Sequence, residues 1–320
     1  MEICKPIVRK PHIIEKKHKK WFWNYMRDYW QLYVLLAPAV IWFLVFAYYP
    51  MYGVTIAFRA FQANLGINGS AWVGLKWFRQ FLKDPWFFKL LKNTLLLSVY
   101  GLVAGFPLPL LLAFMINEVR NKPFQKTVQM ITYAPHFLSN VVVCGMITIF
   151  FRVKTGIVNI AISALGGEQV DFLMQAPLFK HLYVWSGVWM GAGWGTIIYL
   201  ASLASVDQEV IEASIIDGCN RIQKIYYIDF PTIKPTIVIN LLLSLGGVLG
   251  SDGEKIVLLQ NPVTKMVSET YGSYMYNEGI LGANKYDYTA AAGMFQSIVN
   301  LILLSFFNFI AKKLGDTALW

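Results

Sequence analysis

Residues 31–50 read QLYVLLAPAVIWFLVFAYYP, a run of 20 residues without any Asp, Glu, Lys or Arg. A helix of that length crosses a bilayer hydrocarbon core roughly 30 Å thick. The whole chain of 320 residues is 56% hydrophobic and 14% charged, whereas soluble domains carry about 25% charged residues. This composition excludes a cytosolic enzyme, a disordered chain and a nucleic-acid-binding domain, in spite of the net charge of +10. The sequence therefore predicts an integral membrane protein.

Five further apolar stretches follow the first one. Because the backbone in lipid must satisfy its own hydrogen bonds, each stretch is expected to be a helix. Unbroken apolar runs also argue against a membrane barrel, whose strands would alternate. The predicted fold is all-α, with six transmembrane helices in a domain of residues 31–312. The expected spans are 32–58, 94–116, 127–151, 182–204, 233–250 (the shortest) and 289–311.

Lys and Arg close to the spans predict the orientation of the chain. The N-terminal tail, residues 1–30, carries eight of them and is expected in the cytoplasm, where it serves as a topology signal that rests on anionic lipid; docking of a partner is the alternative. An even number of spans returns the C-terminal tail, 313–320, to the same side. Loops 117–126 and 205–232 would then also be cytoplasmic. The external loop 59–93 is basic as well and fits the rule poorly.

The interiors of the six spans contain no Asp, Glu, Lys or Arg, and His136 is the one titratable group deep in a span. Ion-driven carriers commonly place carboxylates or histidines at mid-membrane. A lone His beside Pro135 is more often a packing residue. An ion-coupled secondary sugar transporter is therefore the less favoured alternative.

Motifs for catalysis are missing from the sequence. The closest approach to a phosphate-binding loop, GSDGEKI at 250–256, lacks the spacing and the hydroxyl residue of such a loop. The histidines are scattered, and the three cysteines have no CxxC spacing. We expect no catalytic residue and no metal site, which disfavours a membrane-embedded transferase.

Glycines recur in two of the spans. Gly187, Gly191 and Gly195 repeat every four residues, a spacing that predicts close packing against another helix. The fifth span is short and interrupted by glycine, and Asp252, Glu254 and Lys255 follow it. Such an interrupted span is the best indication in the sequence of a polar pathway.

The loop 205–232 predicts a short helix, a turn and a second helix. Asp207 can cap the first helix and Glu209 suits its first turn. Gly218 can supply the left-handed position that ends it, and the second helix begins near Asn220. The first helix would present an apolar ridge with an acidic rim, which fits a groove in a partner protein. The alternative is a plain amphipathic connector on the membrane.

Two segments of this loop, EASIIDG (212–218) and IDFPTIKP (228–235), resemble the E-A-A…D-G…I-x-L-P loop of permease subunits of ATP-binding-cassette (ABC) importers. In that family the loop forms the coupling helix that docks onto the ATPase subunits. Ser214 and Cys219 stand where alanine is usual, and Phe230 where leucine is usual, all small or apolar replacements. The resemblance assigns coupling to these residues: Asp207, Glu209, Glu212, Ala213, Ser214, Asp217, Gly218, Arg221 and Pro231.

Further blocks resemble one subgroup of these permeases, which imports complex oligosaccharides and polysaccharide fragments. They are YYPMYGVTIAFRAF (48–61), WVGLKWFRQF (72–81), LKNTLLLSVYGL (91–102), GWGTIIYLASLA (193–204) and VLLQNP (257–262). The resemblance implies the type I ABC importer fold, with a cytoplasmic coupling helix between helices 4 and 5. It also implies a non-catalytic subunit in the plasma (inner) membrane of a prokaryote, in a heterodimer with a second permease. Two ATPase subunits would bind ATP and Mg, and an extracytoplasmic solute-binding protein would deliver the sugar.

Residues that contact the sugar are expected among the aromatic and amide side chains of the spans and the acidic pair after the fifth span. Aromatic faces and amides suit pyranose rings, although interfacial belts of Trp and Tyr are ordinary in membrane proteins. A basic external loop with Arg79, Lys83 and Lys89 could favour an anionic cargo. The candidates are Tyr100, Trp185, Trp189, Trp194, Asn240, Asp252, Glu254 and Gln296.

Overall fold

The computed structural model describes residue 25 and residues 27–250, 252–282 and 284–314. Most of the predicted N-terminal tail and most of the C-terminal tail lie outside these ranges. Contacts within the chain divide it into two units, residues 1–54 and 55–320. In the first unit the apolar stretch forms a helix that continues through Pro38. Its segments are α2 (Trp30–Phe43), the π-helical η1 (Leu44–Tyr48) and α3 (Tyr49–Met51), followed by the 3₁₀ segment η2 (Tyr52–Phe58) across the boundary.

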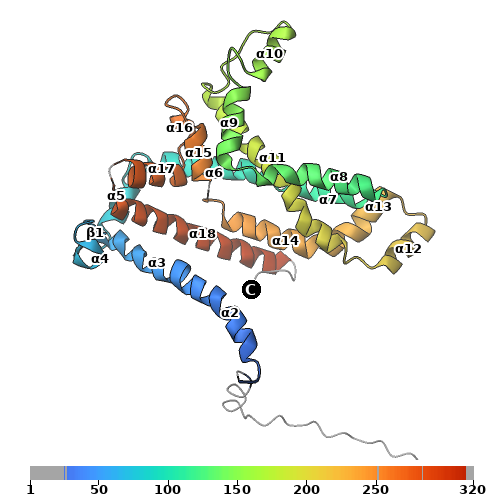
Figure 1. Ribbon diagram of the computed structural model, residues 1–320, viewed down its shortest axis with the longest axis horizontal. Helices are drawn as coiled ribbons and strands as arrows, with labels where there is room; N and C mark the ends of the chain where they lie inside the picture. Colours follow the sequence, from blue (N-terminus) through green and yellow to red (C-terminus); the bar gives the residue numbers. More distant parts are fainter. Residues whose placement is uncertain (1–24, 26, 251, 283, 315–320) are drawn as a thin grey trace, which may run out of the picture. The chain divides into compact units, whose positions relative to one another are not determined.

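The second unit is a body of helices that begins with a small hairpin (Figure 1). Strands β1 (Arg59–Ala60) and β2 (Ala71–Trp72) pair antiparallel. Within this unit, α11 packs against α6 and α7 and also against α8 and α14, while α14 packs against α18. The helices before the loop of residues 205–232, called the docking loop below, are α4 (Gly66–Gly69), α5 (Lys76–Leu82), α6 (Phe87–Gly105), α7 (Pro107–Asn117), α8 (Lys122–Tyr133), η3 (Ala134–Phe137), α9 (Asn140–Phe150), α10 (Ile157–Ala164) and α11 (Ala176–Leu203).

The remaining helices lie in the docking loop, in the fifth and sixth spans and in the segment between them. They are α12 (Gln208–Ile216), α13 (Arg221–Lys224), η4 (Ile225–Asp229), α14 (Phe230–Gly246), α15 (Gly253–Leu259), α16 (Lys265–Ser268), α17 (Tyr271–Tyr276), η5 (Asn277–Leu281) and α18 (Tyr286–Leu314).

Among the described residues, four helices are long and apolar enough to cross a membrane, and two bent pairs raise the number to six if each is one span. This result confirms the predicted all-α, six-helix fold. The unbroken spans are Trp30–Phe58, Phe87–Asn117, Arg221–Gly246 and Tyr286–Lys313, and the bent pairs are Lys122–Phe137 with Asn140–Phe150 (96°) and Ala176–Leu203 with Gln208–Ile216 (83°).

Several span boundaries differ from the expected ones. The third stretch is not one straight helix, because η3 contains Pro135 and Ser139 caps a new helix by accepting from Val142 N. The fourth begins at Ala176, where a proline in the first turn favours a helix start. The fifth begins at Arg221, because α13, η4 and α14 continue as one helix and Pro231 lies in the first turn of α14.

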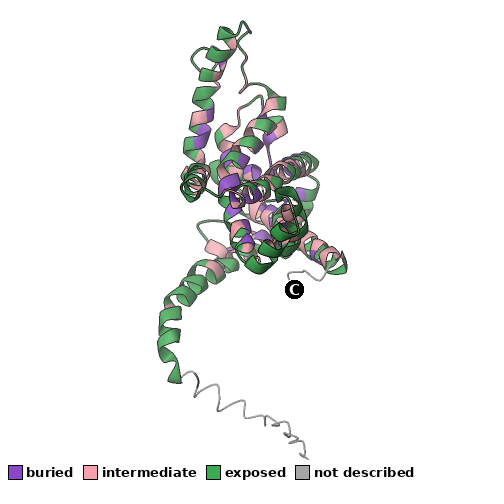
Figure 2. Cartoon of the chain, turned by 90° about the vertical axis from the view of Figure 1, so that its right-hand side faces the viewer, coloured by how far each residue is buried: buried purple, intermediate pink, exposed green. Residues whose placement is uncertain are grey.

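Buried residues gather inside the helical body of the second unit, whose outward faces are largely exposed (Figure 2). Three apolar clusters make up this interior. The first, around Phe81 and Tyr271, joins α5, α6, α17 and α18; the second, around Leu97 and Val188, joins α6, α11 and α15. The third, around Phe114 and Tyr199, joins α7, α11 and α14.

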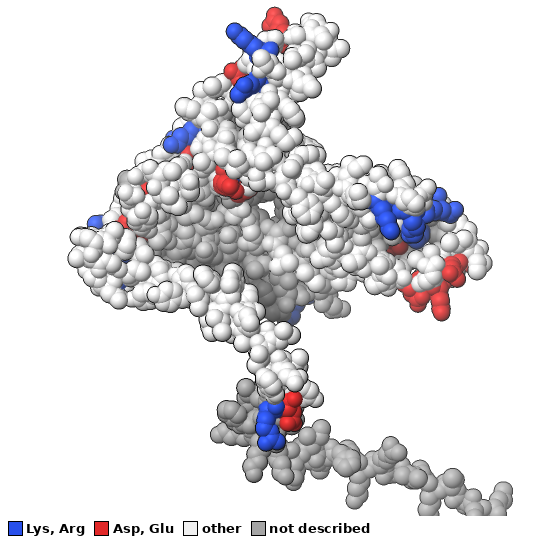
Figure 3. Space-filling view, in the orientation of Figure 1, with Lys and Arg blue, Asp and Glu red and all other residues white. Residues whose placement is uncertain are grey.

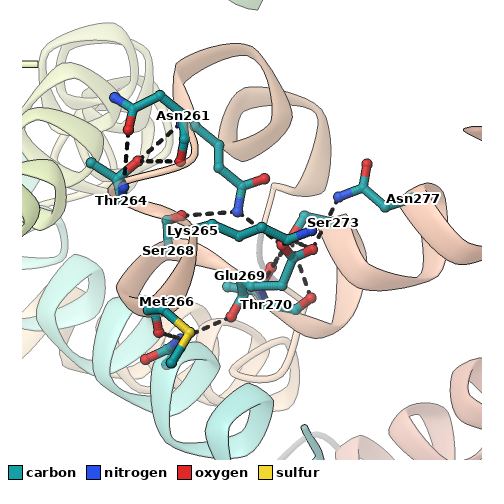
Figure 4. A network of polar contacts seen from close by, with 11 residues as sticks. Asn261, Thr264, Lys265, Met266, Ser268, Glu269, Thr270, Ser273 and Asn277 are labelled. Atoms are coloured by element: carbon teal, nitrogen blue, oxygen red, sulfur yellow. Dashed lines mark hydrogen bonds and ion pairs between the residues drawn. The ribbon is translucent and has the colours of Figure 1, made fainter. Parts of the chain in front are cut away.

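The segment between the fifth and sixth spans is fixed by the buried carboxylate of Glu269 (Figure 4). Its Oε1 accepts hydrogen bonds from Ser273 Oγ and Asn277 Nδ2, both at 3.1 Å, and its Oε2 accepts one from Gln260 Nε2 at 2.9 Å. Asn93 of α6 donates to the Glu269 carbonyl at 3.0 Å. A buried charge needs such partners, and here they tie α15, α16 and α17 to α6.

Candidate functional site

The docking loop, residues 205–232, contains a short helix with a defined start and end. Asp207 caps α12 by accepting a hydrogen bond from Glu209 N at 2.9 Å. At the other end Gly218 has φ +79°, Gly218 N donates to Ile215 O, and Cys219 N donates to Ser214 O. These two bonds and the left-handed glycine are a Schellman motif. The predicted helix stop at Gly218 is thereby confirmed.

The second turn of the docking loop is also capped. The Asn220 side chain accepts from Gln223 N, and the Gln223 side chain accepts from Asn220 N, which is a capping box. Arg221 therefore opens α13 at an exposed position. Both short helices are fixed by local hydrogen bonds, so the loop has a definite shape without a partner.

The surface of α12 is apolar with an acidic rim. Val210, Ile215 and Ile216 are exposed, and Ile216 is 85% exposed. Acidic side chains gather over α12, while basic side chains gather over the neighbouring ends of α8 and α13 (Figure 3). Among the described residues, Glu212 accepts a side-chain hydrogen bond from Gln208 Nε2 of its own helix and from no other element. The acidic rim is therefore available to a partner.

A buried ionic cluster connects the docking loop to the spans. Lys224 Nζ donates to Glu118 Oε1 at the end of α7 and to Asp229 Oδ2 at 3.2 Å. Asp229 is 1% exposed, and its Oδ1 has no hydrogen-bond partner among the described residues. The sequence reasoning missed Lys224, although a Lys and an Asp five residues apart fit one turn of the π-helix that forms there. The cluster links α7, α13 and α14.

Two adjoining cavities lie between α6, α7, α11 and the segment after α14. Their volumes are about 540 and 340 Å³, and they share Gly101, Gly105, Pro109, Tyr183 and Asp252. Both volumes fall in the range of small-molecule sites, roughly 300–1,000 Å³. The polar residues that line the larger cavity are Ser98, Tyr183, Tyr199, Asn240, Ser244 and Asp252.

The segment at α15 carries the charges of these cavities. Asp252 and Glu254 each accept a hydrogen bond from Asn140 Nδ2 of α9, at 2.9 and 3.0 Å. Lys255, 3% exposed, points the other way and donates from Nζ to the Tyr183 carbonyl of α11 at 2.8 Å. Burial lowers the pKa of Lys255 to about 8. The acids and the lysine thus lie on two sides of α15.

The predicted sugar contacts separate into two groups. Asn240 and Asp252 line the larger cavity. Glu254 lies beside Asp252, whereas Gln296 donates to the Leu249 carbonyl and holds the loop after α14. Tyr183 and Lys255 line the cavities and were not among the candidates; a sequence signal for Lys255 existed, because it follows the acidic pair.

The predicted aromatic contacts lie outside the cavity linings. Trp185 Nε1 donates to Tyr100 Oη at 2.9 Å, and Tyr100 Oη lies 2.7 Å from His181 Nδ1. Trp194 stacks on His136 with ring centroids 4.5 Å apart. Trp185, Trp189 and Trp194 are about half exposed, as expected of residues that face lipid or a second subunit. No group of three metal-ligating side chains occurs in the part of the chain that the structure describes.

The expected packing role of the glycine repeat in α11 is correct only for Gly195. A Cβ added there would lie 3.0 Å from Pro109 of α7. A Cβ on Gly191 would meet no atom within 4 Å, and one on Gly187 would meet Lys255 Nζ at 3.2 Å. Both glycines line the smaller cavity. The interpretation as a helix–helix seam is wrong at these two positions, because the repeat faces open space and the lysine of α15.

A multi-pass bundle with a cavity between its spans and a capped helix outside them is the architecture of a membrane permease. The chain belongs to the family of binding-protein-dependent transport system inner membrane components, whose model matches residues 105–316. It is 42% identical over 289 residues to the polygalacturonan/rhamnogalacturonan transport system permease protein YteP of Bacillus subtilis, covering 90% of each chain. The predicted family is confirmed.

Solved structures agree with this assignment. A bacterial ABC transporter involved in the import of the acidic polysaccharide alginate matches with a TM-score of 0.82 at 38% identity, over 92% of this chain and 99% of that one. The bacterial alginate transporter in complex with an alginate pentasaccharide-bound periplasmic protein matches with a TM-score of 0.83 at 37% identity, over 93% and 99%. The type I importer permease fold is thereby confirmed.

Proposed function

We propose that this chain is a permease subunit of an ATP-driven importer for oligosaccharides or polysaccharide fragments. The docking loop carries this proposal: α12 is capped at both ends, presents an exposed apolar face and an acidic rim, and matches the coupling loop of ABC importers at Glu212, Asp217 and Gly218. Family membership and the transport names of its relatives support the same reading.

The proposed assembly contains a second permease, two ATPase subunits and an extracytoplasmic solute-binding protein. The cavities support the second permease, because the described residues leave them open, and the predicted contacts Trp185, Trp189 and Trp194 are about half exposed. The alginate transporter crystallised with a sugar-loaded periplasmic protein supports the binding protein. ATP and Mg would bind to the ATPase subunits, and this chain would be non-catalytic.

In the proposed mechanism the docking loop transmits movement from the ATPase subunits to the spans. ATP drives transport only by binding more tightly to one conformational state of the complex than to the other. The ATPase pair would move α12, and Lys224 would transmit that movement to α7 and α14 through Glu118 and Asp229. The helices that line the cavities would then open alternately to the two sides of the inner membrane, with both termini of the chain in the cytoplasm.

The test is co-purification of the tagged chain from its native membrane in mild detergent, for the wild type, Gly218→Asp and Gly166→Asp. Both glycines have positive φ, +79° and +83°, and a Cβ on either meets no atom within 4 Å. The two substitutions therefore impose the same backbone strain, but Gly166 follows α10, far from the docking loop.

We expect an ATPase and a second permease with the wild type and with Gly166→Asp, and loss of the ATPase alone from Gly218→Asp. Equal recovery of the ATPase with all three chains would contradict the proposal that the docking loop binds the ATPase. A chain recovered alone in every case, with uptake driven by an ion gradient, would replace the importer by a secondary carrier.

A further inference from the structure

Glycine residues form part of the wall of the two cavities. Gly101 and Gly105 of α6 and Gly187 and Gly191 of α11 all line the smaller one. Cβ atoms added at Gly101 and Gly191 would meet nothing within 4 Å. At these two glycines the wall is therefore backbone with open space in front of it, whereas a Cβ on Gly105 would contact Val188 Cγ2 of α11 at 3.5 Å. A cargo can approach this backbone closely.

Only two charged residues line the cavities, Asp252 and Lys255. The carboxylate of Asp252 is already engaged: Oδ1 accepts from Lys255 N at 3.2 Å and Oδ2 accepts from Asn140 at 2.9 Å. The ammonium of Lys255 has three N–H donors and uses one of them within the described residues, toward the Tyr183 carbonyl. It also lies 4.9 Å from the centroid of the Tyr183 ring.

Lys255 has no carboxylate within ion-pair distance among the described side chains. A buried charge without a counter-ion is unfavourable, because it loses water and gains no opposite charge. Gly187, whose added Cβ would lie 3.2 Å from Nζ, leaves the ammonium accessible from the smaller cavity. An anionic group that enters the cavity would be its first ion-pair partner.

We propose that Lys255 is the cationic contact for the carboxylate of a uronic-acid unit, and that the glycine-walled cavity is the subsite that holds this sugar ring. This inference rests on the proposed importer function and names its substrate class. The hydroxyl groups of the ring would meet the polar side chains of the larger cavity, among them Asn240 and Ser244. A neutral sugar would leave Lys255 without a counter-ion.

The test uses the complete importer in proteoliposomes with its binding protein. The probes are galacturonate and mannuronate trimers and the same trimers as methyl esters, which keep the ring and lose the charge. Because one binding protein delivers every probe, the ratio of variant to wild-type uptake isolates the contribution of this chain. The variants are Lys255→Met, Lys255→Arg and, as a matched control, Lys312→Met, whose lysine is exposed in the last turn of α18.

We expect Lys255→Met to lower uptake of the acid trimers about tenfold or more, the size of a lost charged hydrogen bond, and to leave ester uptake nearly unchanged. Lys255→Arg should restore the preference for the acid, and Lys312→Met should change neither acid nor ester uptake. Equal losses for acid and ester would make Lys255 a structural residue and overturn the proposal. Unchanged acid uptake in Lys255→Met would overturn it as well.

A second variant avoids the buried lysine. Gly191→Asp places a carboxylate on the open wall without displacing any atom within 4 Å of the new Cβ. We expect it to reduce uptake of the acid more than uptake of the ester, because like charges repel. Equal reduction of both would contradict the subsite. If the wild-type importer takes up neither form although the ATPase and the second permease co-purify with the chain, the assignment of Lys255 to a uronate is wrong and the proposed importer function stands.

Discussion

Lys255 is the residue on which the chemistry of the cavities depends. Its folded pKa of about 8 lies below the ordinary value of 10.5, because burial disfavours the charged form. Between these two values the unfolded chain holds a proton that the folded chain has lost. The free energy of unfolding therefore rises with pH in this range, by at most about 1.4 kcal/mol per pH unit.

The same titration predicts a pH dependence of uptake. Burial lowers the pKa of Lys255 more than the nearby Cys144 of α9 and Asp252 of its own segment raise it. Uronates stay ionised between pH 7 and 9, so the preference for acid over ester trimers should fall as Lys255 loses its proton near or above pH 8. Uptake by Lys255→Met should show no such change over this range, and a parallel decline in both would contradict the assignment.

Asn159 is a second residue whose role can be measured. It is fully buried; its Nδ2 donates to the carbonyls of Arg152 (3.1 Å) and Val170 (2.9 Å), and its Oδ1 accepts from Val170 N (2.8 Å). Asn159→Ala leaves these backbone groups unsatisfied, at about 1–3 kcal/mol each. We expect several-fold faster tryptic cleavage after Arg152 and Lys154 of the purified protein. Ser163→Ala, exposed on α10, should be cleaved at the wild-type rate.

At the scale of elements, Lys224 joins α7 to α13 and α14. Lys224→Met would leave the buried Asp229 carboxylate without its partner, and breaking a buried ion pair costs about 3–5 kcal/mol. We expect a clearly lower melting temperature of the purified protein. Adding Asp229→Leu, which removes the uncompensated charge, should recover most of the loss.

The control for this cluster is Lys234→Met, because Lys234 lies on α14 and is exposed. Lys234→Met should have the same melting temperature as the wild type. If Lys224→Met also had the melting temperature of the wild type, the ionic cluster would not stabilise the attachment of the docking loop to the spans. The movement of α12 would then have to reach α7 and α14 through other contacts.

At the scale of the whole chain, orientation is testable with two exposed serines. Ser163 lies on α10 and Ser205 in the docking loop. With the three native cysteines replaced by serine, an impermeant maleimide added to right-side-out vesicles should label Ser163→Cys at once. Ser205→Cys should be labelled only after permeabilisation. The reverse pattern would place the docking loop outside, where no ATPase could reach it.

The sequence predicted the class of fold and the docking loop well, because both depend on local patterns. Apolar length defined the spans, and Asp207 and Gly218 marked the ends of α12. The 96° bend of the third span was missed because an apolar run keeps its hydropathy through a break at Pro135. Helix starts were placed too late where Lys89 and Lys92 lie inside α6.

The cavity could not be predicted in the same way, because it depends on which helices meet. A four-residue glycine repeat looks the same in the sequence whether it faces a helix or open space. Only the surroundings of Gly191 in the fold show that it faces open space. Lys255 and Tyr183 are 72 residues apart in the chain, and no local pattern relates them. The aromatic residues predicted as sugar contacts were selected because aromatic rings suit pyranose rings. The residue type does not show whether a side chain points into the cavity or away from it.

The glycine wall of the cavity tolerates substitution at little cost to the packing of the protein. At Gly101 and Gly191 a small side chain would meet no neighbouring atom, so a single nucleotide change there narrows or decorates the passage without disturbing the protein interior. If this cavity is the cargo path proposed above, importers of this family can change cargo by successive single substitutions along its wall.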